Sequence, residues 1–325
     1  MPIRSLTLAA AALVLAAPAA LAFEPSKPEC IAPASPGGGF DLTCRLAIQA
    51  LQDLKLLKEP MRVTYMPGGI GAVAINTVNA QRADDPNLIV AISAGSALNI
   101  AQGKFGKYTQ KDARWIAALG TDFGTIVVRA DSPHKSLKDL LAAVKADPTK
   151  VVFGAGGTVG SQDWMKVAIA VKAVGVDPKS MRFVAFEGGG AVLTALLGGH
   201  IQAMSGDASE VAAQIEGGKV RVLAVMSEDR LPGKLNNIPT AKEQGFDLVW
   251  PTWRGVYAAP KITEEQAKFW IDTFAKAVKT PEFAKIQEER GLFPYVKIGK
   301  DFADLVDADV ERFRQLAKEA GLATN

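Results

Sequence analysis

The sequence predicts a two-lobed α/β protein in which each lobe is a doubly wound sheet flanked by helices. Three observations indicate this fold: short apolar strands alternate with helices, glycine-rich turns follow the strands, and two strand-like stretches lack the usual following helix. In open α/β sheets a ligand lies at the carboxyl ends of the strands. We therefore expect the glycine-rich turns to line a cleft between the lobes.

The alternation extends over most of the chain. Strands are expected at residues 30–33, 62–65, 88–93, 151–154, 182–186, 201–204 and 220–225. Helices are expected at 41–57, 72–81, 136–146, 161–174, 190–197 and 208–216. The last part is mainly helical, at 263–279, 281–290 and 300–320, with a short strand near Tyr295. Asp41 is suited to be the N-cap of the helix expected at 41–57.

The two strand-like stretches without a following helix are residues 125–129 and 255–259. If each crosses from one lobe to the other, one lobe contains both ends of the mature chain and the other contains the middle. This predicts lobe 1 at 23–126 together with 254–325, lobe 2 at 127–253, and two hinge crossings beside the cleft.

The first 22 residues have the pattern of a secretory signal peptide. Arg4 precedes an apolar run from Leu6 to Leu21, and Ala20-Leu21-Ala22 is a small-x-small cleavage motif. The run is short for a membrane span, and no Cys stands at the cleavage point. We therefore expect export, with cleavage after Ala22.

Composition favours a chain with a large core and no nucleic-acid partner. The sequence is 48% hydrophobic and 22% charged, with a formal charge of +3. No block of Lys and Arg with interleaved aromatic residues occurs in it. The basic residues are scattered, as on solvated faces.

Cys30 and Cys44 are the only cysteines and lie fourteen positions apart. In an exported protein such a pair favours one structural disulfide, which would join the first strand to the helix that follows it. The alternatives are a metal site and a redox couple. Further metal ligands are lacking because His134 and His200 lie far away in the sequence, and redox pairs usually have Cys-x-x-Cys spacing.

Four glycine-rich turns follow predicted strands, at residues 36–41, 67–71, 154–161 and 188–190. Glycines let a backbone approach a ligand closely, and a helix N-terminus beyond such a turn favours an anion. None of the turns ends in the Gly-Lys-Ser/Thr of a phosphate-binding loop. Gly154 and Gly156 fit a dinucleotide fingerprint, but Val159 stands where its third glycine belongs. We expect no cofactor.

The sequence offers no assembled catalytic group. A Ser-His-Asp triad would need His134 or His200, and both stand in loop-like segments. No Gly-x-Ser-x-Gly elbow occurs. The carboxylate pairs Asp84-Asp85 and Glu264-Glu265 read as solvated or capping charges. We predict a binding protein and no catalytic or metal site.

The set of motifs resembles a known family, the substrate-binding receptors of tripartite tricarboxylate transporters, which includes the Bordetella uptake group. The resemblance rests on the motifs at 36–41, 67–71, 154–161, 186–191 and 238–240, in this order along the mature chain. Cys30, Cys44, Gly206-Asp207 and the segment 250–255 are more similar to the citrate-receptor branch. The sequence departs from many relatives at two places: it has Tyr65-Met66 where they have Asn or Arg, and Gln162-Asp163-Trp164 where they have a His.

The resemblance implies a periplasmic binding-protein fold that closes on a di- or tricarboxylate and delivers it to two integral-membrane subunits. It implies that one carboxylate lies at the first turn and the other at the third. It also implies that Asp207 adjusts selectivity between them, unless that residue is a helix N-cap. Arg254 would meet a third carboxylate, stack on an aromatic ring or stay at the rim. The candidate ligand-binding residues are Gly38, Gly39, Phe40, Asp41, Ser93, Gly157, Thr158, Gly160, Ser161, Asp207 and Arg254.

Two other classes of function stay open from the sequence. One is an exported sensor that reports occupancy to a signalling partner, and the other is an exported α/β enzyme. We expect a monomer whose ligand is a small carboxylate such as citrate or malate.

Overall fold

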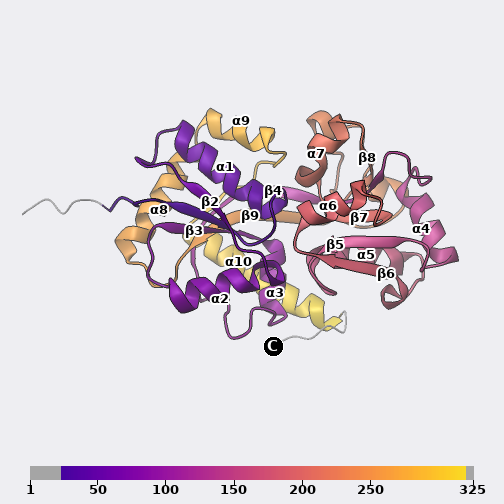
Figure 1. The fold of residues 1–325 in the computed structure, drawn as a ribbon, viewed down its shortest axis with the longest axis horizontal. Helices are drawn as coiled ribbons and strands as arrows, with labels where there is room; N and C mark the ends of the chain where they lie inside the picture. Colours follow the sequence, from indigo (N-terminus) through magenta and orange to yellow (C-terminus); the bar gives the residue numbers. More distant parts are fainter. Residues whose placement is uncertain (1–22, 320–325) are drawn as a thin grey trace, which may run out of the picture.

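The computed structural model describes residues 23–319 and has two lobes, which the long strand β4 connects (Figure 1). The predicted signal peptide, residues 1–22, lies outside the described residues. We call the part built on β1, β2 and β3 the first lobe, and the part built on β5, β6 and β7 the second lobe. No helix within 23–319 is both long enough and apolar enough to cross a membrane.

The strands form one mixed sheet in the order β2-β1-β3-β9-β4-β7-β5-β6. β1 pairs in parallel with β2 and β3, and β5 pairs in parallel with β6 and β7. The first-lobe strands are β1 (Glu29–Ala32), β2 (Arg62–Tyr65), β3 (Leu88–Ser93), β9 (Pro251–Ala258) and β10 (Lys297–Ile298). The second-lobe strands are β5 (Val152–Gly156), β6 (Arg182–Phe186), β7 (Ala203–Asp207) and β8 (Val220–Val225). The α/β binding-protein fold predicted from the sequence is confirmed.

A single strand, β4 (Arg114–Arg129), belongs to both lobes. Its first part, up to Phe123, pairs antiparallel with β9, and its second part, from Gly124, pairs with β7 and β8. The chain returns to the first lobe ahead of β9, where the Gly124 N–H donates to the Trp250 carbonyl at 3.0 Å. The predicted lobe bounds, 23–126 with 254–325 and 127–253, stay a prediction.

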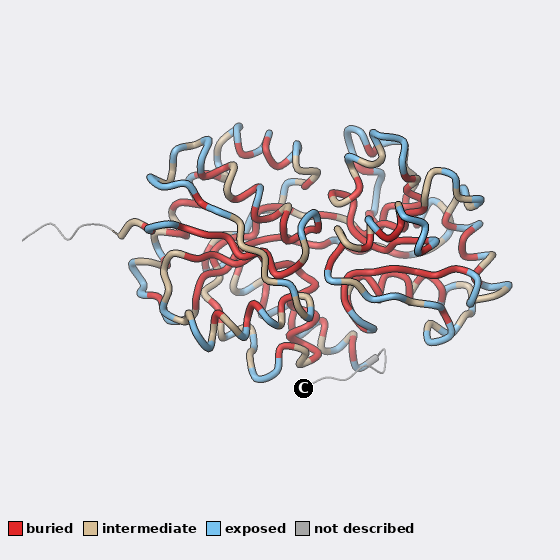
Figure 2. Tube along the Cα trace, viewed as in Figure 1, coloured by how far each residue is buried: buried red, intermediate tan, exposed pale blue. Residues whose placement is uncertain are grey.

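Helices cover the faces of the sheet (Figure 1). In the first lobe they are α1 (Gly39–Asp53), α2 (Ala72–Gln81), α3 (Ala94–Ala101), α8 (Glu264–Ala277), α9 (Pro281–Glu289) and α10 (Lys300–Glu319). In the second lobe they are α4 (Leu137–Ala146), α5 (Gln162–Ala173), α6 (Gly189–Leu197) and α7 (Ala208–Glu216). The strands between them are largely buried, while the outer helix faces are exposed (Figure 2).

Two helices differ from the sequence-based expectation. α1 begins at Gly39, so Gly38 is the N-cap and Asp41 lies in the first turn, which corrects the role of Asp41 as a cap. The helix ends at Asp53 because Lys55 has a positive φ of 53°. α3 was not expected, because every residue in it is buried and it has no polar face.

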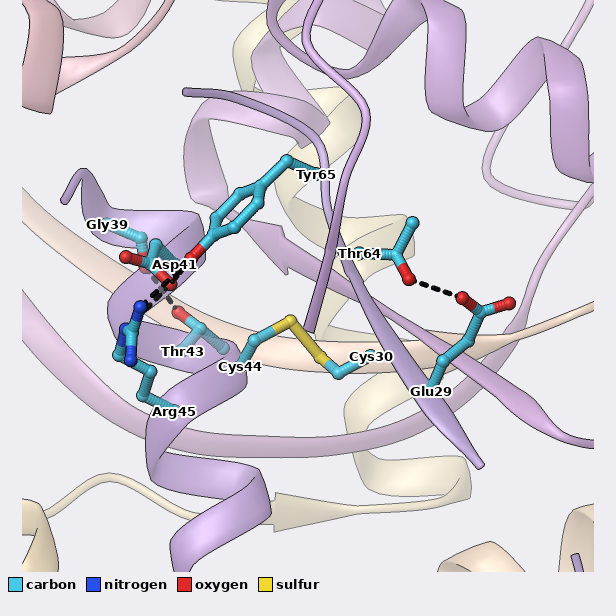
Figure 3. The surroundings of a disulfide bond; sticks show 9 residues. All are labelled: Glu29, Cys30, Gly39, Asp41, Thr43, Cys44, Arg45, Thr64 and Tyr65. Carbon is cyan, nitrogen blue, oxygen red and sulfur yellow. Dashed lines mark hydrogen bonds and ion pairs between the residues drawn. A yellow bond between two sulfur atoms is a disulfide. The ribbon is translucent and has the colours of Figure 1, made fainter. Parts of the chain in front are cut away.

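The disulfide between Cys30 and Cys44 is confirmed (Figure 3). It joins β1 to α1 with a Cα–Cα distance of 5.6 Å. Both cysteines are fully buried, and the first glycine-rich turn lies between them in the sequence. The bond therefore fixes the strand and the helix on either side of that turn.

Candidate functional site

Two adjoining cavities lie between the lobes, at the ends of the glycine-rich turns. The first cavity is about 40 Å³ and the second about 120 Å³. The first is lined by Ala34, Gly39, Phe40, Ile70, Ser93, Gly95, Asn99, Gly156, Ser161, Gln162, Asp163, Gly188, Gly189, Asp207, Glu210 and Arg254. The second is lined by Gly69, Ile70, Asn99, Lys104, Gly157, Thr158, Ser161, Ala185, Phe186 and Glu187. Ile70, Asn99 and Ser161 belong to both linings, so the cavities form one cleft.

The structure brings most of the sequence-predicted site residues to this cleft. Gly39, Phe40, Ser93, Ser161, Asp207 and Arg254 line the first cavity, and Gly157, Thr158 and Ser161 line the second. Gly38, Asp41 and Gly160 line neither cavity. The Gly160 carbonyl accepts from Gln102 of the first lobe at 2.8 Å, so that residue contributes to the contact between the lobes.

Asp41 is engaged within the first lobe (Figure 3). Its carboxylate accepts from the Gly37 N–H at 2.8 Å, from Arg45 at 2.9 Å and from the Tyr65 hydroxyl at 2.9 Å. Burial, and then the hydrogen bond to Asp41, raise the pKa of Tyr65. Asp41 thus holds the first glycine-rich turn in shape.

A largely buried charge cluster adjoins the first cavity, and four of its six members line that cavity. It contains four carboxyl groups and two cations, namely Asp122, Asp163, Asp207, Glu210, Lys166 and Arg254. Lys166 of α5 donates to Asp163 at 2.8 Å and to Asp207 at 2.5 Å. Arg254 of β9 donates to Asp122 at 3.0 Å and to Asp207 at 2.7 Å. Each cation therefore forms ion pairs with two carboxylates. Arg254 is buried and does not lie at the rim of the cleft, which was one of the positions considered from the sequence.

Asp207 is both a helix cap and a residue of the cleft, and its role in selectivity stays a prediction. It is the N-cap of α7, in a capping box with Glu210, and it also lines the first cavity. Burial by itself would raise the pKa of Asp207, but Lys166 and Arg254 lower it below the ordinary value. Asp207 is therefore the most strongly ionised acid of the cluster.

Glu210 has the opposite electrostatic environment. Burial, and then the charge of Asp207, raise its pKa to about 7. Its two carboxyl oxygens accept from the Gly39 N–H at 2.8 Å and from the Asp207 N–H at 3.0 Å. Glu210 of the second lobe therefore occupies the N-terminus of α1 in the first lobe, where the sequence places a ligand carboxylate.

The glycines of the site make room for these buried side chains. A Cβ at Gly39 would overlap the Arg254 guanidinium, and one at Gly189 would overlap the Glu210 carboxylate. A Cβ at Gly95 would lie 2.7 Å from the Gln162 amide. The sequence indicates that the backbone at these glycines approaches another group closely. In this structure that group is a polar side chain of the protein itself.

Sequence reasoning missed several residues of the cleft and of the charge cluster beside it. Asp122, Lys166, Glu210, Asn99 and Lys104 were not singled out. The available signals were Lys166 within the apolar run of α5 and the departure from many relatives at Gln162-Asp163. A charged residue on a buried helix face needs a partner, which marks it as a site candidate.

Comparison with known proteins identifies what this arrangement is similar to. A family model described as "Tripartite tricarboxylate transporter family receptor" matches residues 47–322. A Cupriavidus necator protein described as "UPF0065 protein in gbd 5'region" is 28% identical over 289 residues, covering 88% of this chain and 85% of its own.

Solved structures show the same fold at lower sequence identity. Periplasmic binding protein BugD has a TM-score of 0.80 at 21% identity, covering 92% of this chain and 98% of its own. MatC of Rhodopseudomonas palustris, solved with malate, has a TM-score of 0.77 at 21% identity, and the match covers 89% of this chain and 98% of the MatC chain. An R. palustris protein solved with adipate has a TM-score of 0.80 at 21% identity and covers 91% and 98%.

Proposed function

We propose that this chain, which belongs to the tripartite tricarboxylate transporter family of receptors, captures a small di- or tricarboxylate between its lobes and delivers it to a membrane transporter. Citrate and a C4-dicarboxylate such as malate are the first candidates. The family is one of solute-binding receptors rather than enzymes. Two structural relatives were solved with the dicarboxylates malate and adipate, which supports this ligand class.

The observation that carries the proposal is the donor set of the second cavity. Thr158, Ser161 and Lys104 line it, and α5 begins directly after Ser161. Hydroxyl groups, an ammonium and a helix N-terminus all favour a carboxylate. Burial lowers the pKa of Lys104, whose ammonium donates to the Val159 carbonyl at 3.0 Å. A ligand carboxylate in the second cavity would stabilise the charged form of the Lys104 ammonium and so raise its pKa again.

The cleft also connects ligand capture to lobe closure. Lys104 and Gln102 of the first lobe donate to the turn that contains Thr158, and the Gly68 N–H donates to Glu187 at 3.1 Å. A ligand that contacts both sides of the cleft stabilises the closed arrangement by its differential affinity. Delivery of the ligand then requires a membrane partner that favours the open arrangement.

Binding is tested on the mature protein by a thermal-shift screen of citrate, malate, succinate and tartrate, followed by calorimetry. The double variant Thr158→Ala/Ser161→Ala should weaken the best ligand sharply, by about 100-fold if two charge-assisted hydrogen bonds are lost. Ser161 also caps α5, so Ser136→Ala, which removes the equivalent cap of α4 away from the cleft, is the matched control. Unchanged affinity in the double variant would remove this site assignment.

Delivery is tested by uptake of labelled ligand into cells that contain the two membrane subunits. Uptake should require this chain, and the Thr158→Ala/Ser161→Ala variant should reduce it in proportion to the lost affinity. Uptake that is equally fast without the chain would contradict the transport role and favour the sensor alternative.

A further inference from the structure

The first and fourth glycine-rich turns contact each other across the cleft, backbone against backbone. The first turn precedes α1 in the first lobe, and the fourth leads into α6 in the second lobe. A Cβ at Gly190 would lie 2.2 Å from the Pro36 carbonyl oxygen and 3.1 Å from the Gly38 nitrogen. In the other direction, a Cβ at Gly38 would lie 3.2 Å from the Gly189 nitrogen. The lobes therefore approach each other here more closely than a side chain at Gly190 would allow.

Three hydrogen bonds join the lobes around this contact. The Ser35 N–H donates to the Glu187 carbonyl at 3.1 Å. The Glu187 carboxylate also accepts from the Gly68 N–H at 3.1 Å. The Glu210 carboxylate accepts from the Gly39 N–H at 2.8 Å. All three donors belong to the first lobe and all three acceptors to the second, so groups of the second lobe occupy N–H donors of the first two glycine-rich turns.

The requirement for glycine at residue 190 comes from the opposite lobe and not from the local backbone. Gly190 does not have a positive φ, so other residues could adopt its conformation. It lies in the first turn of α6, where alanine would be intrinsically more favourable. Gly190 also lines neither cavity. The space that its side chain would need is filled by the backbone of residues 36–38. A side chain is therefore excluded at this position only while the lobes are in contact.

We propose that residues 34–39 and 187–190, together with Glu210, form a closure contact that holds the lobes together before a ligand binds, so that the ligand-free protein is mostly closed. A ligand then enters while the lobes are briefly open and stabilises the closed arrangement further. The inference goes beyond the proposed capture of a carboxylate, and it does not depend on which ligand the cleft takes.

The closed arrangement is tested by the distance between the lobes in the mature protein, freed of bound ligand by unfolding and refolding with its disulfide intact. Ala80→Cys on α2 and Ala173→Cys on α5 supply one exposed labelling position in each lobe. The two native cysteines are bonded to each other, so a spin label reacts only with the introduced thiols. Pulsed electron paramagnetic resonance should give one main population, at the distance between these positions in the structure. A main population at a longer distance would overturn the inference.

Gly190→Ala separates the closure contact from the fold of each lobe. Its Cβ would overlap the Pro36 oxygen only in the closed arrangement, so at least half of the closed population should move to longer distances. Gly217→Ala at the end of α7 is the matched control, because its Cβ would lie 3.5 Å from its nearest contact, the Ala213 carbonyl oxygen. The control should keep the wild-type distances. A wild-type distance distribution in Gly190→Ala would overturn the closure contact.

A second variant tests the same contact from the first lobe. Gly38 is the N-cap of α1 with an extended backbone, a position where asparagine is at least as favourable as glycine. Gly38→Asn would place its Cβ 3.2 Å and 3.3 Å from two backbone nitrogens of the second lobe and should also lengthen the distance between the lobes. If Gly190→Ala did not fold, Gly38→Asn would decide in its place. Since no ligand enters these measurements, the lobes could prove open while the thermal-shift screen still finds a carboxylate ligand, which would overturn this inference and leave the proposed function standing.

Discussion

Glu210 should make the stability of this protein fall as the pH rises through the weakly acidic range. Burial and the neighbouring Asp207 raise its pKa from the ordinary 4.5 to about 7 in the folded protein. Between these two values the folded protein holds a proton that the unfolded chain has released. The contribution is fully present below about pH 4.5, declines as the pH rises and is lost above about pH 7.

The size of this change in stability follows from the interval between the two pKa values of Glu210. Each pH unit corresponds to about 1.4 kcal/mol, so the free energy of unfolding should lose about 3 kcal/mol across the window because of this one carboxyl group. Glu210→Gln cannot titrate. Its amide can accept only one of the two N–H groups that Glu210 accepts, from Gly39 and Asp207, which should lower stability by an amount that does not change with pH.

The assay is urea unfolding of the wild type and of Glu210→Gln at several pH values from about 4.5 to about 8. The difference between their free energies of unfolding should change by about 3 kcal/mol in favour of the variant as the pH rises. Glu216→Gln is the matched control, because Glu216 ends the same helix, is half-exposed and pairs with Lys234 at 2.6 Å. If Glu210→Gln and the wild type had parallel pH profiles, the assigned environment of Glu210 would be wrong.

Two further outcomes follow from the same structure. Arg254→Met should lower the free energy of unfolding by about 3–5 kcal/mol, measured by urea unfolding, because it leaves Asp122 and Asp207 without their shared partner; a loss below about 1 kcal/mol would contradict the ion pairs. Cys30→Ala/Cys44→Ala should cost about 3 kcal/mol in the same assay by removing a short cross-link, and a midpoint equal to that of the oxidised wild type would show that the bond adds nothing.

The sequence predicts the fold well where local pattern and tertiary structure agree. β2, β3, β6, α2, α7 and β8 lie where periodicity and glycine punctuation place them. α3 was not predicted, because a helix that is buried on all sides has no amphipathic period to detect. The end of α1 is set by the backbone at Lys55, which a hydrophobic pattern that continues to Leu57 does not indicate.

The sequence predicts which turns meet at the candidate site but not which charged side chains lie beside it. The glycine-rich turns do meet at the cleft, because parallel strands place their carboxyl ends at one edge of a sheet. The cluster depends on pairs far apart in the sequence: Lys166 with Asp207 across 41 positions, and Arg254 with Asp122 across 132. No local pattern encodes such contacts. The sequence therefore indicates where the cleft lies more reliably than which ligand it would bind.

The paired strands between the lobes also determine how much disorder the protein loses when it binds. β4 continues through both lobes and is hydrogen-bonded to β9 up to the crossing at Phe123 and Gly124. Sliding the lobes apart would break this ladder, so opening is confined to bending and twisting of a short two-stranded ribbon. An open arrangement would then sample a narrow set of geometries in place of the broad set that a flexible linker would allow. If the lobes close on a ligand as we propose, closure costs correspondingly little entropy, and more of the contact energy remains as affinity.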